Sequence, residues 1–211
     1  TTRPWSTVAV FAVLLVVSIA GLTQLEIDTD FTKRLGEENR VRQDEKYFED
    51  NFGGSLTIEF YVDAPEEGGL LDPERYAAIS GFIDEMEKMP EIDRAASIVE
   101  VLDRVHREMA PPEMRDQAPD SRELLAQYLL LFEMSSDGYD LDRLIDFDRR
   151  TMRILASIPG KAVRESYETG RQAFALAGPV QAAGVEVEPT GGIYLIGQWL
   201  ENIVAGQRNG I

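Results

Sequence analysis

The sequence predicts an α/β (α+β) protein with one transmembrane helix at its N-terminus, and three observations support this. An almost wholly apolar stretch without any charge occupies residues 7–22. Residues 56–63 and 151–158 alternate apolar and polar side chains with a period of two, which is typical of half-buried strands. Apolar residues between these segments recur at helical spacing. Helices and strands that alternate along a chain indicate layers of helices packed on sheets.

The composition excludes several classes of function. The 211 residues carry 21 Lys plus Arg against 38 Asp plus Glu, a net charge of −17, which excludes a nucleic-acid binder that works by neutralising phosphates. A hydrophobic content of 44% is typical of a chain that buries a core. There is no cysteine, so disulfides, thiolate metal sites and cysteine catalysis are excluded. The absence of an initial Met and the helix-like pattern at Ile211 lead us to expect a piece of a longer protein.

The first predicted element is transmembrane helix 1, to which we assign residues 1–25. Its apolar part approaches the ~20 residues that a bilayer span requires. Arg3 precedes this part and three acids follow it at 26–30, so the positive-inside rule predicts a cytoplasmic N-terminus with residues 26–211 outside. Two alternatives are open: a signal peptide, for which Ser-Ile-Ala at 18–20 is a suitable cleavage site, and a buried core helix.

Residues 26–108 are predicted to form a first α/β unit. Its elements are a short strand at 25–30, a helix at 41–52, a strand at 56–63, a helix at 73–89 and a strand at 92–102. Gly53-Gly54 is expected to end the first of these helices. Asp72 followed by Pro73 is typical of a helix start, because the carboxylate caps free N–H groups and proline fits the first turn.

A proline-rich connecting loop at 109–120 separates this unit from a second one at 121–191. The second unit is predicted to contain a helix that starts at Asp120 with a capping-box partner at Glu123, a strand at 151–158, a long helix at 161–183 and a strand at 185–188. Residues 192–211 are predicted to form an amphipathic helix that leads to a missing second membrane helix.

No catalytic, cofactor-binding or metal-binding residue is predicted. His106, the only histidine, has no recognisable nucleophile or acid beside it, so we expect a surface histidine. One dense acidic run lacks the residue order of a calcium loop and is interpreted as a solvated loop. Its members are Asp137, Asp140, Asp142, Asp146 and Asp148.

Four short segments follow one another in a defined order. They are residues 25–31 (LEIDTDF), 52–54 (FGG), 71–73 (LDP) and 184–191 (GVEVEPTG). Their order and spacing resemble the start of a resistance-nodulation-division (RND) transporter, most closely the MMPL-like and hopanoid-type lipid exporters. The resemblance spans essentially the whole chain.

This resemblance implies a fold and a function. The fold is a first membrane helix followed by an extracytoplasmic (periplasmic) porter domain, here of two ferredoxin-like βαβ layers. The function is proton-driven export of hydrophobic or amphiphilic lipids, hopanoid-like or other, from the bacterial inner membrane, without enzymatic activity. Implied partners are a lipid or hydrophobic small molecule, the membrane, and the remaining membrane helices and second porter domain, with a homo-oligomer left open. No nucleic acid, cofactor or metal is implied, and the proton-relay acids lie outside this chain.

Apolar side chains on two predicted helices are candidates for the lining of a lipid path. They are Phe82 and Met86 in the helix at 73–89, and Tyr167 and Phe174 in the helix at 161–183. The alternative for each is an ordinary core position. Two other functions are also considered: a membrane-anchored extracytoplasmic interaction module without transport activity, and a secreted enzyme, which the lack of a catalytic constellation disfavours.

Overall fold

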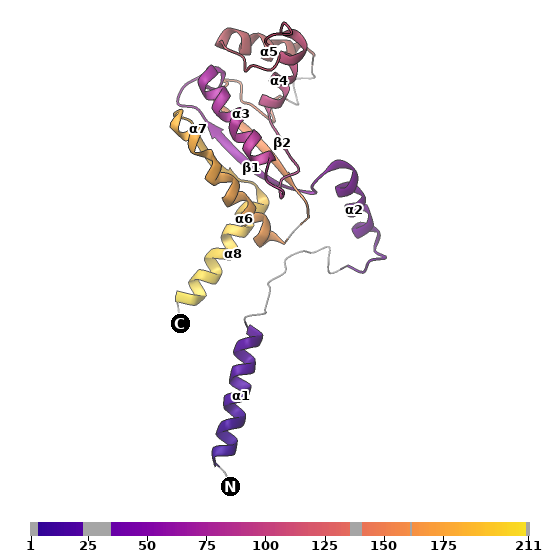
Figure 1. Cartoon of the computed structure of the whole chain (residues 1–211), viewed down its shortest axis with the longest axis vertical. Coiled ribbons are helices and arrows are strands. Elements are labelled where there is room, and N and C mark those ends of the chain that lie inside the picture. The colour runs from indigo at the N-terminus through magenta and orange to yellow at the C-terminus, as the bar shows by residue number, and fades with distance from the viewer. Residues whose placement is uncertain (1–3, 23–34, 136–140, 161, 210–211) are drawn as a thin grey trace.

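The computed structural model describes residues 4–22, 35–135, 141–160 and 162–209, and a four-stranded antiparallel sheet forms its centre (Figure 1). The strands are β1 (Leu56–Asp63), β2 (Arg94–Ala96), β3 (Thr151–Ile158) and β4 (Glu186–Thr190), in the spatial order β2-β3-β1-β4. The predicted strands at 56–63 and 151–158 are confirmed with these bounds. They pair with each other along their whole length, from Leu56 opposite Ile158 to Asp63 opposite Thr151.

The connections make two βαβ units that interleave. The first runs from β1 through α3 (Pro73–Glu87) to β2, and the second from β3 through α6 (Val163–Phe174) to β4. Each unit supplies one central strand and one edge strand, the arrangement known as split βαβ. The expectation of two separate layers is therefore wrong. Two strands alone are marginally stable and leave unpaired edges, whereas interleaving pairs β1 and β3 on both sides.

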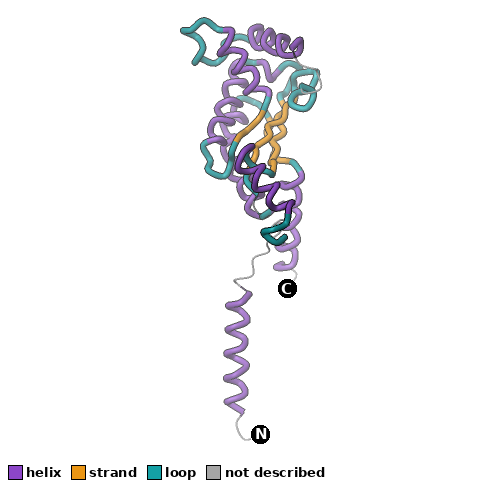
Figure 2. The backbone as a smooth tube through the Cα atoms, turned by 90° about the vertical axis from the view of Figure 1, so that its right-hand side faces the viewer, coloured by secondary structure: helices purple, strands orange, loops and turns teal. Residues whose placement is uncertain are grey.

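Helices cover one face of the sheet (Figure 2), and the hydrophobic core lies between these helices and that face. The alternation in β1 buries Ile58, Phe60 and Val62 completely on this face. The ring of Phe82 in α3 meets that of Phe60 edge to face, with centroids 5.6 Å apart. The predicted start of α3 is confirmed, because Asp72 Oδ1 accepts hydrogen bonds from the backbone N–H groups two and three residues later, at 3.1 and 3.2 Å.

The long helix predicted at 161–183 is interrupted. After α6 the chain forms a 3-10 turn, η2 (Ala175–Ala177), and then α7 (Gly178–Ala182), with Pro179 in the first turn of α7. Proline has no N–H to donate to the preceding turn and its ring clashes with the carbonyl four residues earlier, which disfavours a continuous α-helix here. The strand that follows begins at Glu186, one residue later than predicted, after Gly184 in the left-handed conformation with φ 78°.

The strand predicted at 92–102 is wrong for most of its length. Only the three residues of β2 form a strand, and α4 (Ile98–Met109) starts after the single residue Ser97. Ile98, Val99, Leu102 and His106 are buried, with the spacing of one helix face. The next helix, α5 (Arg122–Ser135), is capped by Ser121 rather than Asp120: the Leu124 N–H donates to Ser121 Oγ at 3.3 Å. In Figure 1, α4 and α5 lie together at the upper end of the molecule.

The helix predicted at 41–52 is confirmed as α2 (Arg40–Phe52), followed by Gly53 with a φ of 92°. A short 3-10 turn, η1 (Gly69–Leu71), precedes α3. The strand predicted at 25–30 lies outside the described residues.

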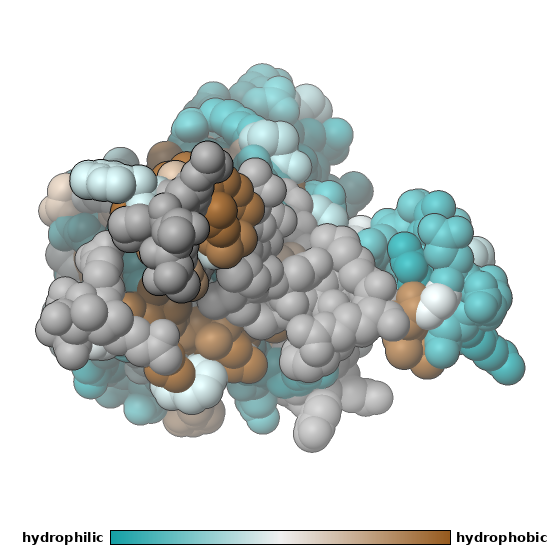
Figure 3. Space-filling view, turned by 90° about the horizontal axis from the view of Figure 1, so that it is seen from below, coloured by the Kyte–Doolittle hydropathy of each residue, from teal (hydrophilic) through white to brown (hydrophobic). Residues whose placement is uncertain are grey.

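The two remaining helices are α1 (Pro4–Leu22) and α8 (Gly192–Asn209). Figure 3 views the lower end of the molecule and shows apolar residues there in brown. Within the part of the chain that the structure describes, no helix combines the length and the apolar character that a membrane crossing requires. A helix does form where the membrane span is predicted, and the span itself stays a prediction.

Candidate functional site

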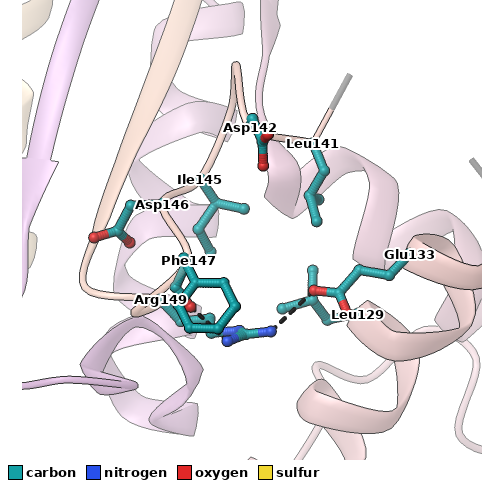
Figure 4. A pocket seen from close by; sticks show the side chains of 8 residues that line it. All are labelled: Leu129, Glu133, Leu141, Asp142, Ile145, Asp146, Phe147 and Arg149. Carbon is teal, nitrogen blue, oxygen red and sulfur yellow. Dashed lines mark hydrogen bonds and ion pairs between the residues drawn. The ribbon is translucent and has the colours of Figure 1, made fainter. Parts of the chain in front are cut away.

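A pocket of about 260 Å³ lies between α5 and the turn that precedes β3 (Figure 4). Its walls combine apolar side chains with three carboxylates and one guanidinium. The lining residues are Leu129, Glu133, Leu141, Asp142, Ile145, Asp146, Phe147 and Arg149.

Arg149 reaches across the pocket to α5. Its Nη2 donates to Glu133 Oε1 at 3.0 Å, and its guanidinium lies 5.1 Å from the centroid of the Phe147 ring. The backbone of Arg149 has a φ of 51°, a left-handed conformation that non-glycine residues seldom adopt. Asp146 supports this turn, because its Oδ1 accepts from the N–H groups of Arg150 at 2.8 Å and Thr151 at 2.9 Å.

Most polar groups of this pocket therefore already have partners within the protein. Glu133 is paired with Arg149, and Asp146 holds the turn, so these side chains fasten the turn to α5. Among the residues that the structure describes, no three acidic or histidine side chains are grouped so that they could hold a metal ion. The sequence reasoning missed this pocket. The only sign of the pocket in the sequence is Phe147, a single aromatic residue within a charged run. In the structure the Phe147 side chain is 83% exposed.

The four candidate lipid-path residues lie in or against the hydrophobic core. Phe82, Met86 and Tyr167 are buried members of the core, and Phe174 is partly buried against it. None of them lines the pocket between α5 and the turn. Their positions are those of ordinary core residues in this conformation, and a lipid path along them stays a prediction.

His106 is not at the surface, which corrects the sequence interpretation. It is 3% exposed, and both ring nitrogens have partners: Nδ1 lies 3.0 Å from the Tyr128 hydroxyl and Nε2 lies 3.0 Å from the Met114 carbonyl oxygen. We assign the proton to Nε2, because this neutral tautomer donates to the carbonyl and accepts from the hydroxyl. His106 thus joins α4, the connecting loop and α5.

Asp103 and Tyr76 form a second polar contact inside the domain, between α4 and α3. The Tyr76 hydroxyl lies 2.7 Å from Asp103 Oδ1 and 3.2 Å from the Val99 carbonyl oxygen. Burial, followed by the Asp103 charge, raises the pKa of Tyr76 well above its ordinary value. Burial also raises the pKa of Asp103, although the Tyr76 hydrogen bond and Arg107 act in the opposite direction.

The raised pKa of Asp103 predicts a pH-dependent stability difference. The folded protein holds the Asp103 proton more tightly than the unfolded chain, so this group's stabilising contribution is complete below its ordinary pKa of about 3.9 and is lost as the pH rises through the raised value. Asp103→Asn keeps an acceptor for Tyr76 and does not titrate. The free energy of unfolding of the wild type, minus that of the variant, is expected to fall as the pH rises from about 4. Urea unfolding at a series of pH values measures this difference, and a difference that rises with pH would contradict the assignment.

Two apolar surfaces remain without a protein partner in the described residues. The large apolar side chains of α1 that the structure describes are all more than half exposed, from Trp5 at 84% to Leu14 at 55%. On α8, one face exposes a further apolar set: Leu195, Ile196, Trp199 and Ile203. Extended apolar surfaces of this kind mark contacts with membranes or proteins.

No family model matches this chain, and no curated protein matches it. The likeness to RND transporters therefore rests on the four short segments quoted above and stays a prediction. The fold and the two apolar surfaces are the independent observations on which a functional proposal can be built.

Proposed function

We propose that this chain is the membrane-attached porter-domain part of a proton-driven exporter similar to the RND lipid exporters. In this proposal α1 lies in the lipid bilayer of the bacterial inner membrane, with its N-terminus cytoplasmic, and the α+β domain stands outside the cytoplasm. The observation that supports it best is the exposure of apolar side chains on α1. The cargo that fits the resemblance is a hydrophobic or amphiphilic lipid.

The energetics of α1 favour lipid over water. Full burial of a valine, leucine or phenylalanine side chain gains about 1.5–3 kcal/mol, so four such side chains gain about 6–12 kcal/mol. No ionisable side chain lies within Pro4–Leu22, so none opposes insertion. For the same reason α1 cannot relay protons, and the coupling residues of this exporter would have to lie outside this chain.

The charge of the chain fits a domain that stands away from the lipid. With a net charge of −17 and an uncharged α1, the acid excess belongs to the part after α1. Anionic lipid headgroups repel such a surface.

A second candidate function is a membrane-anchored interaction module without transport activity of its own. The observation in its favour is the burial of Phe82 and Met86, which lie in the hydrophobic core rather than at an open surface. Exposed apolar side chains at the other end of the domain, on α5, offer a surface for a protein partner. They are Leu130, Leu131 and Met134.

Vesicle flotation of the full chain tests the attachment by α1. With phosphatidylcholine vesicles, we expect the wild type to float with the lipid. The double variant Leu14→Lys/Val17→Lys should no longer float with the lipid, because each charge near the bilayer centre raises the free energy of insertion by about 2.5–3.5 kcal/mol. Val41→Lys/Tyr47→Lys is the matched control, since it adds the same charge at exposed positions of α2. Equal flotation of the two double variants would contradict the proposal.

Two further experiments in cells test the orientation of the domain and the presence of a lipid path. Protease added outside spheroplasts should digest the α+β domain, whereas protection would reverse the proposed orientation. A photoreactive lipid that labels α3 or α6 of the intact transporter supports a lipid path. Labelling confined to membrane helices favours the interaction module.

A further inference from the structure

Helices α6 and α8 carry the same four-residue pattern and interlock through it. The pattern is Tyr-x-x-Gly, at Tyr167–Gly170 in α6 and Tyr194–Gly197 in α8. Each tyrosine packs on the glycine of the other helix: a Cβ added at Gly197 would lie 2.3 Å from Tyr167 Cβ, and one at Gly170 would lie 2.9 Å from Tyr194 Cδ2. The two tyrosine rings lie side by side with centroids 4.9 Å apart. We name these four residues the tyrosine–glycine clasp.

Polar contacts hold the clasp on its outer side. Burial, followed by the carboxylate of Glu201 in α8, raises the pKa of Tyr167 to about 12. Arg171 lies over the Tyr167 ring at 6.0 Å, and its Nη1 lies 3.7 Å from Glu201 Oε1. The contact therefore combines a close aromatic fit with a small charged network.

The base of α8 is also tied to the centre of the sheet. β4 pairs with the central strand β1, with Thr190 opposite Glu59. Gly191 then turns the chain into α8 with a φ of 92°, so close to β1 that an added Cβ would lie 3.3 Å from the Glu59 nitrogen. Only Gly191 separates the end of β4 from the start of α8, so the first turn of α8 is held beside β1.

From these contacts we propose that α8 is a rigid arm that moves as one body with α6 and the sheet. Sliding α8 along α6 would bring a residue with a Cβ against Tyr167, where only glycine fits. The outer turns of α8 are those that follow the clasp, and their exposed face carries Trp199 and Ile203. When these turns are displaced, the domain therefore moves with them, because α8 does not slide along α6. This coupling goes beyond the proposed function, and it does not depend on which lipid or protein contacts the outer turns of α8.

Distance measurements between two spin labels test the rigid arm in the full chain. The chain has no cysteine, so labels can be placed at Val204→Cys in α8 and Ala77→Cys in α3, both exposed positions. We expect one narrow distance distribution. Gly197→Ala should broaden it or add a second distance, because the added Cβ forces the two helices apart.

Gly206→Ala is the matched control, since it lies in the same helix and its added Cβ meets nothing within 4 Å. The distribution in this control should stay narrow. If Gly197→Ala fails to fold, as judged by circular dichroism, Tyr194→Ala decides instead, because it opens the clasp without adding atoms. A broad distribution in the unsubstituted protein would overturn the rigid arm, and so would a clasp variant that matches the control.

Discussion

Replacing Phe60 with alanine is expected to lower the free energy of unfolding by about 3–5 kcal/mol. Phe60 lies in the central strand β1, is completely buried and packs edge to face against Phe82. Its removal gives up the transfer energy of a large ring and leaves a cavity between the sheet and α3, which close-packed neighbours cannot fill. Urea or thermal unfolding of the full chain measures the loss.

The neighbouring residue provides the control for this prediction. Tyr61 points to the opposite face of β1 and is 39% exposed, so Tyr61→Ala should have a clearly smaller effect. Equal losses for the two variants would mean that the helix-covered face is not the main source of stability.

Replacing His106 with alanine is expected to lower the free energy of unfolding by about 2–4 kcal/mol. A buried polar group that loses its partner costs about 1–3 kcal/mol, and this substitution leaves both the Tyr128 hydroxyl and the Met114 carbonyl without the imidazole. The missing ring adds a cavity between α4 and α5. Because His106 joins three segments, we also expect faster proteolysis within the connecting loop at 110–120, measured by limited digestion.

Glu108→Ala serves as the control for His106, since it changes an exposed position two residues later in the same helix. It should alter stability by no more than about 0.5 kcal/mol. If His106→Ala and Glu108→Ala unfold alike and are digested at the same rate, the imidazole does not hold the loop.

The best-predicted elements are those whose signal is local. The strands at 56–63 and 151–158 were predicted with the bounds that the structure has, because apolar side chains at every second position over eight residues indicate one pleated conformation with a buried face. The start of α3 was equally clear, since Asp72 and Pro73 act within one turn. The region 92–102 was mistaken because a single residue separates the three-residue strand β2 from α4, and so short a strand has no periodicity that could distinguish it from the helix.

The site was predicted less well than the fold. Phe82, Met86 and Tyr167 were recognised as apolar helix residues, yet apolar spacing is the same for a core and for the wall of a channel. The pocket beside α5 depends on Arg149, whose left-handed backbone and reach to Glu133 follow from neighbours distant in sequence. The membrane span stays a prediction, which flotation of the charged variants tests.

The sequence by itself determined where most helices and strands form, that no cysteine chemistry is present, and that the acid excess follows α1. Only the tertiary structure decided that the two βαβ units share one sheet, that His106 is buried between α4 and α5, and that the two Tyr-x-x-Gly patterns meet. The physical reason is the range of the interactions. Backbone conformation responds to side chains within a few residues, whereas strand pairing, burial and helix contact depend on which distant segments pack together.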